Sequence, residues 1–191
     1  MNKHVSMNAP AEGSVRLDHA AYRAMMEADA LPLDGRVEMI RGVLVPMSPA
    51  FDAHGSTQSY VCMALAPVLK RGLKTVIDAS LFLKDDVTVA ADLVVLPKTI
   101  LSQEAKGSDL LFVIEVATSS LSYDTGEKAD IYAANDVQDY LVVDVNDRKS
   151  HLFRDPSPDG YRSIAVEDWS VPIEPLAIPG LVLTLSEIID P

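Results

Sequence analysis

Two strongly apolar runs with a helical pattern between them dominate the centre of the chain. The runs over 110–117 (LLFVIEVA) and 139–145 (DYLVVDV) have the length and the branched side chains of strands that are covered on both faces. Between them, the segment 124–134 (DTGEKADIYAA) places its apolar residues at helical spacing. A strand, a helix and a strand in this order predict an α/β fold.

The flanking segments supply further helices and strands. We expect helices over 17–27 and from His54 to about Lys70, strands over 75–83 and 91–96, and hairpins over 37–48 and 150–167. Ser56 or Thr57 is available to cap the second helix. The chain has 191 residues and no linker-like segment, so we expect a mobile tail over 1–14 and one domain over 15–191.

Composition and charge exclude several classes of protein. Hydrophobic residues make up 48% of the chain and charged residues 23%, which is typical of a globular domain and not of a disordered or fibrous one. Cys62 is the single cysteine, so the chain has no internal disulfide, and no Cys/His cluster has zinc-site spacing. Residues 1–14 lack the apolar core of a secretory signal, and no apolar run approaches the roughly 20 residues of a membrane span. We therefore expect a cytoplasmic protein without a membrane anchor.

Two carboxylates lie within apolar strand segments. Asp92 opens the run ADLVVL, and Glu115 lies inside LLFVIEVA. A carboxylate in such surroundings costs several kcal/mol unless it is hydrogen-bonded, paired or bound to a cation. Each could simply sit at a strand end where a bend reaches water. On neighbouring strands, however, the two would lie close together, and their mutual repulsion would favour a divalent cation between them.

A lysine follows on the next helix. Lys128 comes thirteen residues after Glu115. Its ordinary interpretation is a solvated lysine paired with Asp124 four residues earlier, which is worth about 0.2 to 0.5 kcal/mol. Tyr132, one turn further on, could be ordinary core packing, and Glu38 could be a solvated strand residue.

An ordered series of motifs runs through nearly the whole chain. In sequence order it consists of Glu38 (VEMIRG), Ser48-Pro49, His54, Asp92 (ADLVVL), Glu115 (IEVATSS), Asp124, Lys128, Tyr132 and Tyr140 with LVVDV. This series resembles the Uma-two family of restriction-endonuclease-like proteins, within the PD-(D/E)XK nuclease superfamily. The resemblance covers about residues 17–185. It implies a restriction-endonuclease-like mixed β-sheet flanked by helices, with an added N-terminal hairpin and C-terminal antiparallel strands.

The resemblance also implies a site. It makes Asp92 and Glu115 the ligands of Mg²⁺ or Mn²⁺ and Glu38 an ancillary acid. In the superfamily's usual motif a lysine stands two residues after the glutamate, where this chain has Ala117. The resemblance therefore assigns the lysine's role to Lys128, which can reach the same place from the following helix because the chemistry needs position and not adjacency.

The chain departs from the family pattern at three places. Ala91 stands where the family usually has proline, Thr118-Ser119 where it has Ser-Pro, and Asp136 where it has glycine. Asp136 can still adopt the left-handed conformation that glycine supplies at a helix end. None of the departures removes a predicted metal ligand or the lysine.

The function implied is a metal-dependent endonuclease that hydrolyses DNA phosphodiester bonds, acting as a homodimer so that two sites cut both strands. The alternative is a catalytically inactive nuclease-fold module for binding or dimerisation. A net charge of −12 opposes contact with a polyphosphate, although a local basic patch of Lys70, Arg71, Lys74 and Lys84 could offset it.

Other chemistries have no anchor in the sequence. There is no GxSxG elbow, Walker glycine loop or GxGxxG, which removes serine-hydrolase and nucleotide-binding interpretations. His54 could orient substrate, but a capping or packing role suits its place before a helix better. Cys62 lies on the apolar face of that helix and is most simply a core residue.

Overall fold

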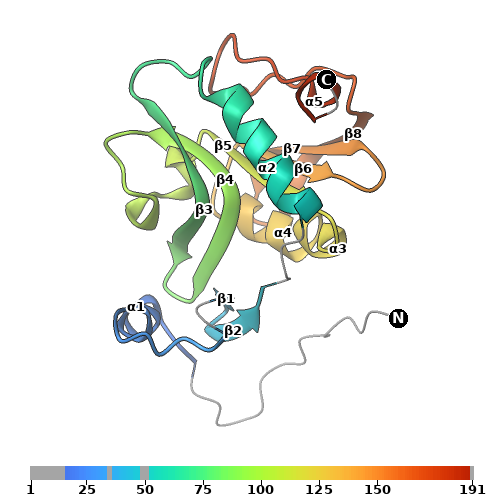
Figure 1. Cartoon of the computed structure of the whole chain (residues 1–191). Coiled ribbons are helices and arrows are strands. Elements are labelled where there is room, and N and C mark those ends of the chain that lie inside the picture. The colour runs from blue at the N-terminus through green and yellow to red at the C-terminus, as the bar shows by residue number, and fades with distance from the viewer. Residues whose placement is uncertain (1–15, 34–35, 48–51, 190–191) are drawn as a thin grey trace.

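The computed structural model describes residues 16–33, 36–47 and 52–189 (Figure 1). Its strands are β1 (Val37–Ile40), β2 (Val43–Pro46), β3 (Leu73–Lys84), β4 (Val87–Pro97), β5 (Phe112–Ala117), β6 (Asp139–Asp144), β7 (Lys149–Ser157) and β8 (Gly160–Asp168). The helices are α1 (His19–Glu27), α2 (Asp52–Leu65), α3 (Leu121–Asp124), α4 (Glu127–Ala133) and α5 (Leu185–Ile189), with short 3₁₀ turns η2 (Ser102–Glu104) and η3 (Gly107–Asp109). The predicted tail over 1–14 and the Ser48-Pro49 motif lie outside the described residues.

All eight strands belong to one mixed sheet. Its order is β2-β1-β4-β5-β6-β7-β8, and β3 pairs with β4 outside this path. The pairing of β5 with β6 is parallel, and the chain passes between them through α3 and α4. The other strand pairings in the described sheet are antiparallel. The strand–helix–strand unit and the mixed sheet flanked by helices, both predicted from sequence, are confirmed.

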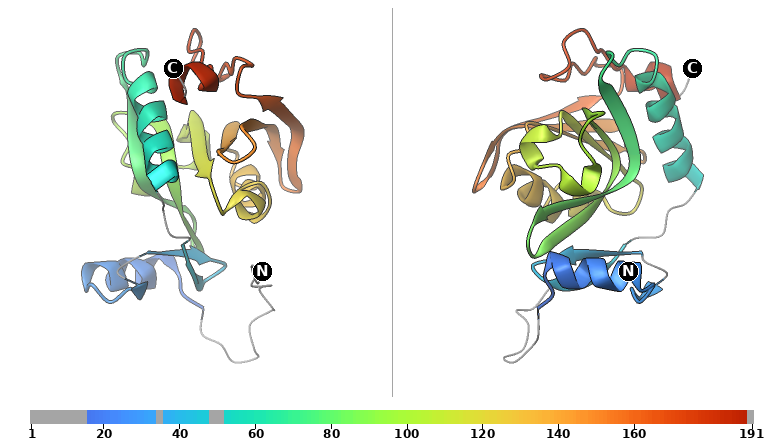
Figure 2. Two further views of the ribbon diagram at one scale, coloured as in Figure 1. Left: turned by 45° about the vertical axis from the view of Figure 1, so that its right-hand side comes forward. Right: turned by 90° about the vertical axis from the view of Figure 1, so that its left-hand side faces the viewer.

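Helices cover the two faces of the sheet, and Figure 2 shows α2 and α4 on opposite sides of it. On one face, Ile131 and Tyr132 of α4 pack into a large hydrophobic cluster. On the other face, Val61 and Leu65 of α2 and Leu185 of α5 belong to a second cluster. The central strands are therefore buried on both sides, as their apolar sequences require.

The N-terminal hairpin and α1 lie at one end of the sheet (Figure 1). Tyr22 of α1 packs with Val37 and Met39 of β1, and its hydroxyl donates a hydrogen bond to the Val37 carbonyl at 3.0 Å. The hairpin joins the main sheet where Met39 pairs with Thr88 of β4. This attachment brings Glu38 to the edge of β4.

Two predicted helix boundaries are wrong. Helix α2 spans Asp52–Leu65, so it begins before His54, and Ser56 and Thr57 lie inside it and not at a cap. Of the predicted helix over 124–134, only Glu127–Ala133 forms α4, and Asp124 is the last residue of α3, because Gly126 between the two helices has a non-helical backbone. A Cβ on Gly126 would come within 2.7 Å of the Ser122 carbonyl oxygen, so this tight junction requires glycine.

Two further observations bear on partners. Lys74 and Lys84 stand near opposite ends of β3, ten residues or roughly 33 Å of strand apart, so they do not form the single basic patch that was considered as an alternative to solvated surface. Among the residues that the structure describes, no helix combines the length and the apolar character needed to cross a bilayer.

Candidate active site

The site lies where β4 and β5 diverge. Their antiparallel ladder pairs Leu93 with Ile114 and continues from there toward the end of β4. Ala90 and Asp92 come before this ladder, so their backbone groups on the side of β5 have no strand partner there. Buried backbone groups of this kind must be satisfied by other polar groups.

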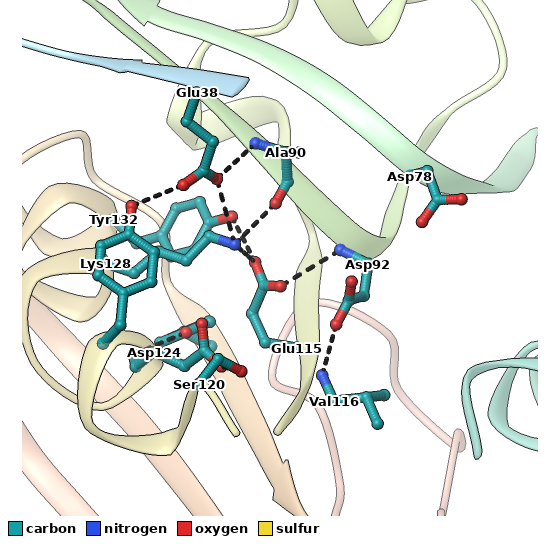
Figure 3. Close-up of polar contacts among 12 residues, drawn as sticks. Glu38, Asp78, Ala90, Asp92, Glu115, Val116, Ser120, Asp124, Lys128 and Tyr132 are labelled. Carbon is teal, nitrogen blue, oxygen red and sulfur yellow. Dashed lines mark hydrogen bonds and ion pairs between the residues drawn. The ribbon is translucent and has the colours of Figure 1, made fainter. Parts of the chain in front are cut away.

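Charged side chains replace the missing ladder (Figure 3). The Ala90 N–H donates to Glu38 Oε1 at 2.9 Å, and Lys128 Nζ donates to the Ala90 carbonyl at 2.7 Å. The Asp92 N–H donates to Glu115 Oε2 at 3.3 Å. Three of the four residues predicted as the site thus bind the backbone of β4, and the fourth belongs to β4 itself.

The opposite side of Asp92 is also irregular. The β3–β4 ladder has no pair at Asp78 and Asp92, and Asp78 has a φ of 49°, in the left-handed region. Gln58 of α2 spans the gap, because its side-chain amide donates to the Asp92 carbonyl at 2.9 Å and to Asp78 Oδ1 at 2.8 Å. The backbone of Asp92 is therefore held by side chains on both of its edges.

The Asp92 carboxylate points toward β5 and α2. Its Oδ2 atom accepts a hydrogen bond from the Val116 N–H at 2.7 Å. Its Oδ1 atom lies 3.3 Å from Nε2 of His54, and the side chains of Asp92 and His54 are each 16% exposed. His54 thus faces a predicted metal ligand, so the capping role considered for it is wrong.

Lys128 is buried with two carboxylates. Its Nζ lies 2.9 Å from Glu115 Oε1 and 3.4 Å from Glu38 Oε1, and its side chain is only 6% exposed. The ordinary interpretation of Lys128 as a solvated lysine is therefore wrong. The structure instead brings this lysine to Glu38, Glu115 and the backbone of β4, as the family resemblance implies.

Tyrosines complete the hydrogen bonds of the two glutamates. Tyr132 of α4 donates its hydroxyl to Glu115 Oε1 at 2.8 Å, and Tyr123 of α3 donates to Glu38 Oε2 at 2.7 Å. Sequence reasoning weighed Tyr132 only as packing or as part of the family pattern, and it missed Tyr123 because nothing in the local pattern distinguishes it. Gln58 was also missed, although its place one turn after His54 on the same helix was an available signal.

Burial and charge act in opposite directions on the central ion pair. Burial raises the pKa of the Glu115 carboxyl well above its usual value, and the nearby Lys128 ammonium only partly opposes this. Burial acts to lower the pKa of Lys128, but the negative charges of Glu115 and Glu38 outweigh it, and the net pKa is raised. Lys128 therefore stays protonated at neutral pH, as a permanent positive charge inside the site.

Asp92 and His54 form a second polar pair, in which the pKa of the carboxyl group is lowered and not raised as in Glu115. Burial acts to raise the pKa of Asp92, but the hydrogen bond to His54 and the charge of Lys128 outweigh it, and the net pKa is lowered. The hydrogen bond to Asp92 raises the pKa of His54, against the effect of its partial burial. Asp92 is thus the ionised carboxylate that lies closest to solvent in this group.

The donor set fits a hard divalent cation. In the described ranges, no three His, Cys, Asp or Glu side chains gather as a ready-made ion cage. Mg²⁺ does not need one, because proteins usually bind it through one or two carboxylates while it keeps several waters. Asp92 and Glu115 supply two carboxylates; that of Glu115 accepts a hydrogen bond from the backbone N–H of Asp92, and the Asp92 side chain is partly open to solvent.

Comparisons with known proteins agree with this fold. The family model Uma2, described as "Putative restriction endonuclease", matches residues 22–186. Among solved structures, a "putative nuclease belonging to DUF820" from Anabaena variabilis is similar, with a TM-score of 0.68 and 15% identity over 86% of this chain and 96% of that chain. At this identity the likeness shows the fold alone. No curated protein matches the sequence. Because the family model spans most of the chain, this protein belongs to the Uma2 family of restriction-endonuclease-like proteins.

Proposed function

We propose that this protein is a metal-dependent endonuclease that hydrolyses phosphodiester bonds in DNA. The observation that carries the proposal is the convergence of Lys128, Glu115 and Asp92 at the point where β4 and β5 separate. Two carboxylates and a buried ammonium group at a gap in a sheet cost stability. Such a group of charges is typical of a site selected for chemistry.

Each residue has a role that its contacts support. Asp92 and Glu115 would hold Mg²⁺ or Mn²⁺, which when bound polarises the phosphate and lowers the pKa of a bound water. Lys128 would orient the attacking water or offset negative charge that develops on the phosphate. Both carboxylate oxygens of Glu38 are engaged, one by the Ala90 N–H and one by the Tyr123 hydroxyl. Its Oε1 atom also lies 3.4 Å from Lys128 Nζ, so we assign Glu38, the ancillary acid, to holding Lys128 in place.

A homodimer is part of the proposal, because cutting both strands of a duplex requires two sites. Sedimentation equilibrium at micromolar concentration should give twice the chain mass of 20.7 kDa. A mass near that of a single chain would contradict the dimer and would favour an enzyme that nicks one strand.

The second candidate is a nuclease-fold binding module without catalysis. The net charge of −12 favours this module over a nuclease, because a negatively charged protein is repelled by a polyphosphate. The Glu115–Lys128–Glu38 network also favours it, since these charges are paired with one another without any ligand.

Plasmid cleavage separates the two candidates. Wild-type protein with Mn²⁺ at low salt should cut supercoiled DNA, and a chelator should stop it. Glu115→Gln should lower the rate more than about a hundredfold, because the neutral amide loses most of the attraction for a hard cation.

The matched control is Glu167→Gln, the same change at an exposed residue of β8, which should cleave like wild type. Equal cleavage by wild type and Glu115→Gln would contradict the site. No cleavage of duplex, single-stranded or branched DNA would favour the binding module.

A further inference from the structure

We propose that His54 is a ligand of the bound cation, and that its imidazole nitrogen makes the site prefer Mn²⁺ or another transition-metal ion to Mg²⁺. The inference rests on the proposed function, since it concerns the same ion. It goes further in adding a nitrogen donor to a site otherwise made of oxygen and in naming the class of metal that the site selects.

The distance between His54 and Asp92 suits two neighbouring ligands of one ion. His54 Nε2 lies 3.3 Å from Asp92 Oδ1. Two ligands at right angles in an octahedron, each about 2.1 Å from the ion, stand about 3.0 Å apart. The separation of the two atoms would therefore need to shrink by only about 0.3 Å for them to share an ion, with a turn of the ring that aims its nitrogen at the ion.

The orientation of the Asp92 carboxylate supports the same conclusion. Its Oδ2 atom is occupied by the Val116 N–H, which fixes the plane of the group. Its Oδ1 atom is turned to the His54 ring, which is the donor that would share an ion with it. His54 and Asp92 are also the more exposed members of the site, since Glu115 and Lys128 have side chains only 2% and 6% exposed.

Helix α2 holds the histidine firmly against the strand. Gln58 follows His54 by one helical turn, and its amide donates to the Asp92 carbonyl at 2.9 Å. The same amide donates to Asp78 Oδ1 on β3 at 2.8 Å. The imidazole is therefore presented by a helix that is tied to the backbone of its partner residue, as a preorganised ligand requires.

Nitrogen ligation has a consequence for metal choice. Mg²⁺ favours oxygen donors, whereas imidazole suits transition-metal ions, whose affinities rise from Mn²⁺ through Co²⁺ and Ni²⁺. A site in which the His54 imidazole joins the Asp92 carboxylate should therefore bind Mn²⁺ more tightly than Mg²⁺. The competing explanation is that His54 only forms an ion pair with Asp92 and leaves when a cation arrives.

Pulsed electron paramagnetic resonance of bound Mn²⁺ distinguishes these cases without an activity assay. Wild-type protein loaded with Mn²⁺ should show echo modulation from a directly coordinated imidazole nitrogen. Incorporating histidine that carries the heavy nitrogen isotope should change this modulation in the unmutated protein. His54→Gln should remove it, and His151→Gln, the same change on β7 away from this contact, should retain it.

Titration with Mn²⁺ and with Mg²⁺ provides the second readout. His54→Gln should weaken Mn²⁺ binding at least about tenfold and Mg²⁺ binding by a smaller factor. Bound Mn²⁺ without nitrogen modulation in wild type, or equal losses for the two metals in His54→Gln, would overturn the inference and leave the proposed function standing. Wild-type protein that binds neither metal would overturn both.

Discussion

Lys128 Nζ on α4 lies 2.9 Å from Glu115 Oε1 on β5, although Lys128 follows Glu115 by thirteen residues and a helix junction. Ala117, where the superfamily's usual motif has its lysine, is fully buried and cannot supply a charge. The following helix returns over the face of the sheet to which Glu115 belongs, so a long side chain from α4 reaches the same carboxylate. A lysine thirteen residues after Glu115 thus pairs with it across the helix junction.

Removing the ammonium group should strongly destabilise the fold. Lys128→Met leaves Glu115 and Glu38 buried without a cation, which we expect to cost about 3 to 5 kcal/mol in the free energy of unfolding. Lys149→Met is the matched control, because Lys149 pairs with Asp168 at the surface, where such pairs contribute at most about 1 kcal/mol. Urea denaturation of both variants measures the difference. Equal small losses would mean that Lys128 does not neutralise the buried carboxylates.

The hydroxyl of Tyr123 should matter more than an ordinary buried hydroxyl. Tyr123→Phe removes a hydrogen bond to the Glu38 carboxylate, and bonds to charged groups are worth about 1.5 to 3 kcal/mol. Tyr161→Phe removes a bond to the neutral Val137 carbonyl, worth about 0.5 to 1.5 kcal/mol. Thermal and urea unfolding should rank the two variants in this order, and the reverse order would contradict a stronger hydrogen bond at Glu38 than at the Val137 carbonyl.

The central elements of the fold were predictable because their sequences carry strong periodic patterns. The apolar runs of β5 and β6 and the amphipathic α4 predicted the strand–helix–strand unit that holds Glu115 and Lys128. The junction at Gly126 was not predicted, since one glycine inside a helical pattern is often tolerated. The start of α2 was missed because Asp52, two residues before His54, shows no periodic signal.

The candidate site was predictable in its charged residues and not in their partners. Asp92 and Glu115 stood out because carboxylates are costly inside apolar strands. The contact of His54 with Asp92 depends on how α2 crosses the sheet, which hydrophobic spacing on one helix does not fix. The hydrogen bond of Tyr123 to Glu38 joins residues 85 positions apart, so it belongs to tertiary structure alone.

The backbone at Asp78 should favour glycine. Its φ of 49° is in the left-handed region, where a Cβ costs about 1 kcal/mol or more. Asp78→Gly and Asp78→Ala both remove the hydrogen bond from Gln58, so their difference isolates the backbone effect. We expect the glycine variant to be more stable by about 1 kcal/mol in urea denaturation, the reverse of the order at a regular strand position. A more stable alanine variant would mean that β3 is regular at this point.

His151 should make stability depend on pH below neutrality. Burial lowers the pKa of His151, although Asp144 at 4.0 Å opposes this, and its Nε2 atom is buried without a hydrogen-bond partner. The unfolded chain, with an ordinary histidine pKa of about 6.5, therefore takes up the proton at a higher pH than the folded one. The contribution of His151 to stability should fall as the pH drops below about 6.5 and level off below the lowered pKa.

The variant His151→Gln lacks this contribution. Its free energy of unfolding, measured by urea denaturation from about pH 7.5 to about pH 5, should fall less steeply than that of wild type. Parallel curves for the two proteins would show that His151 titrates alike in the folded and unfolded states.

The site itself is tested by anomalous X-ray diffraction from crystals soaked in Mn²⁺. We expect one strong anomalous peak in contact with the carboxylates of Asp92 and Glu115, and no peak at this place in Asp92→Asn crystals treated in the same way. The Asp92 carboxylate should keep its hydrogen bond from the Val116 N–H when the ion is bound, since a different oxygen of the group faces the ion. Saturating Mn²⁺ with both carboxylates well ordered and no anomalous peak between them would contradict a metal-dependent site at Asp92 and Glu115.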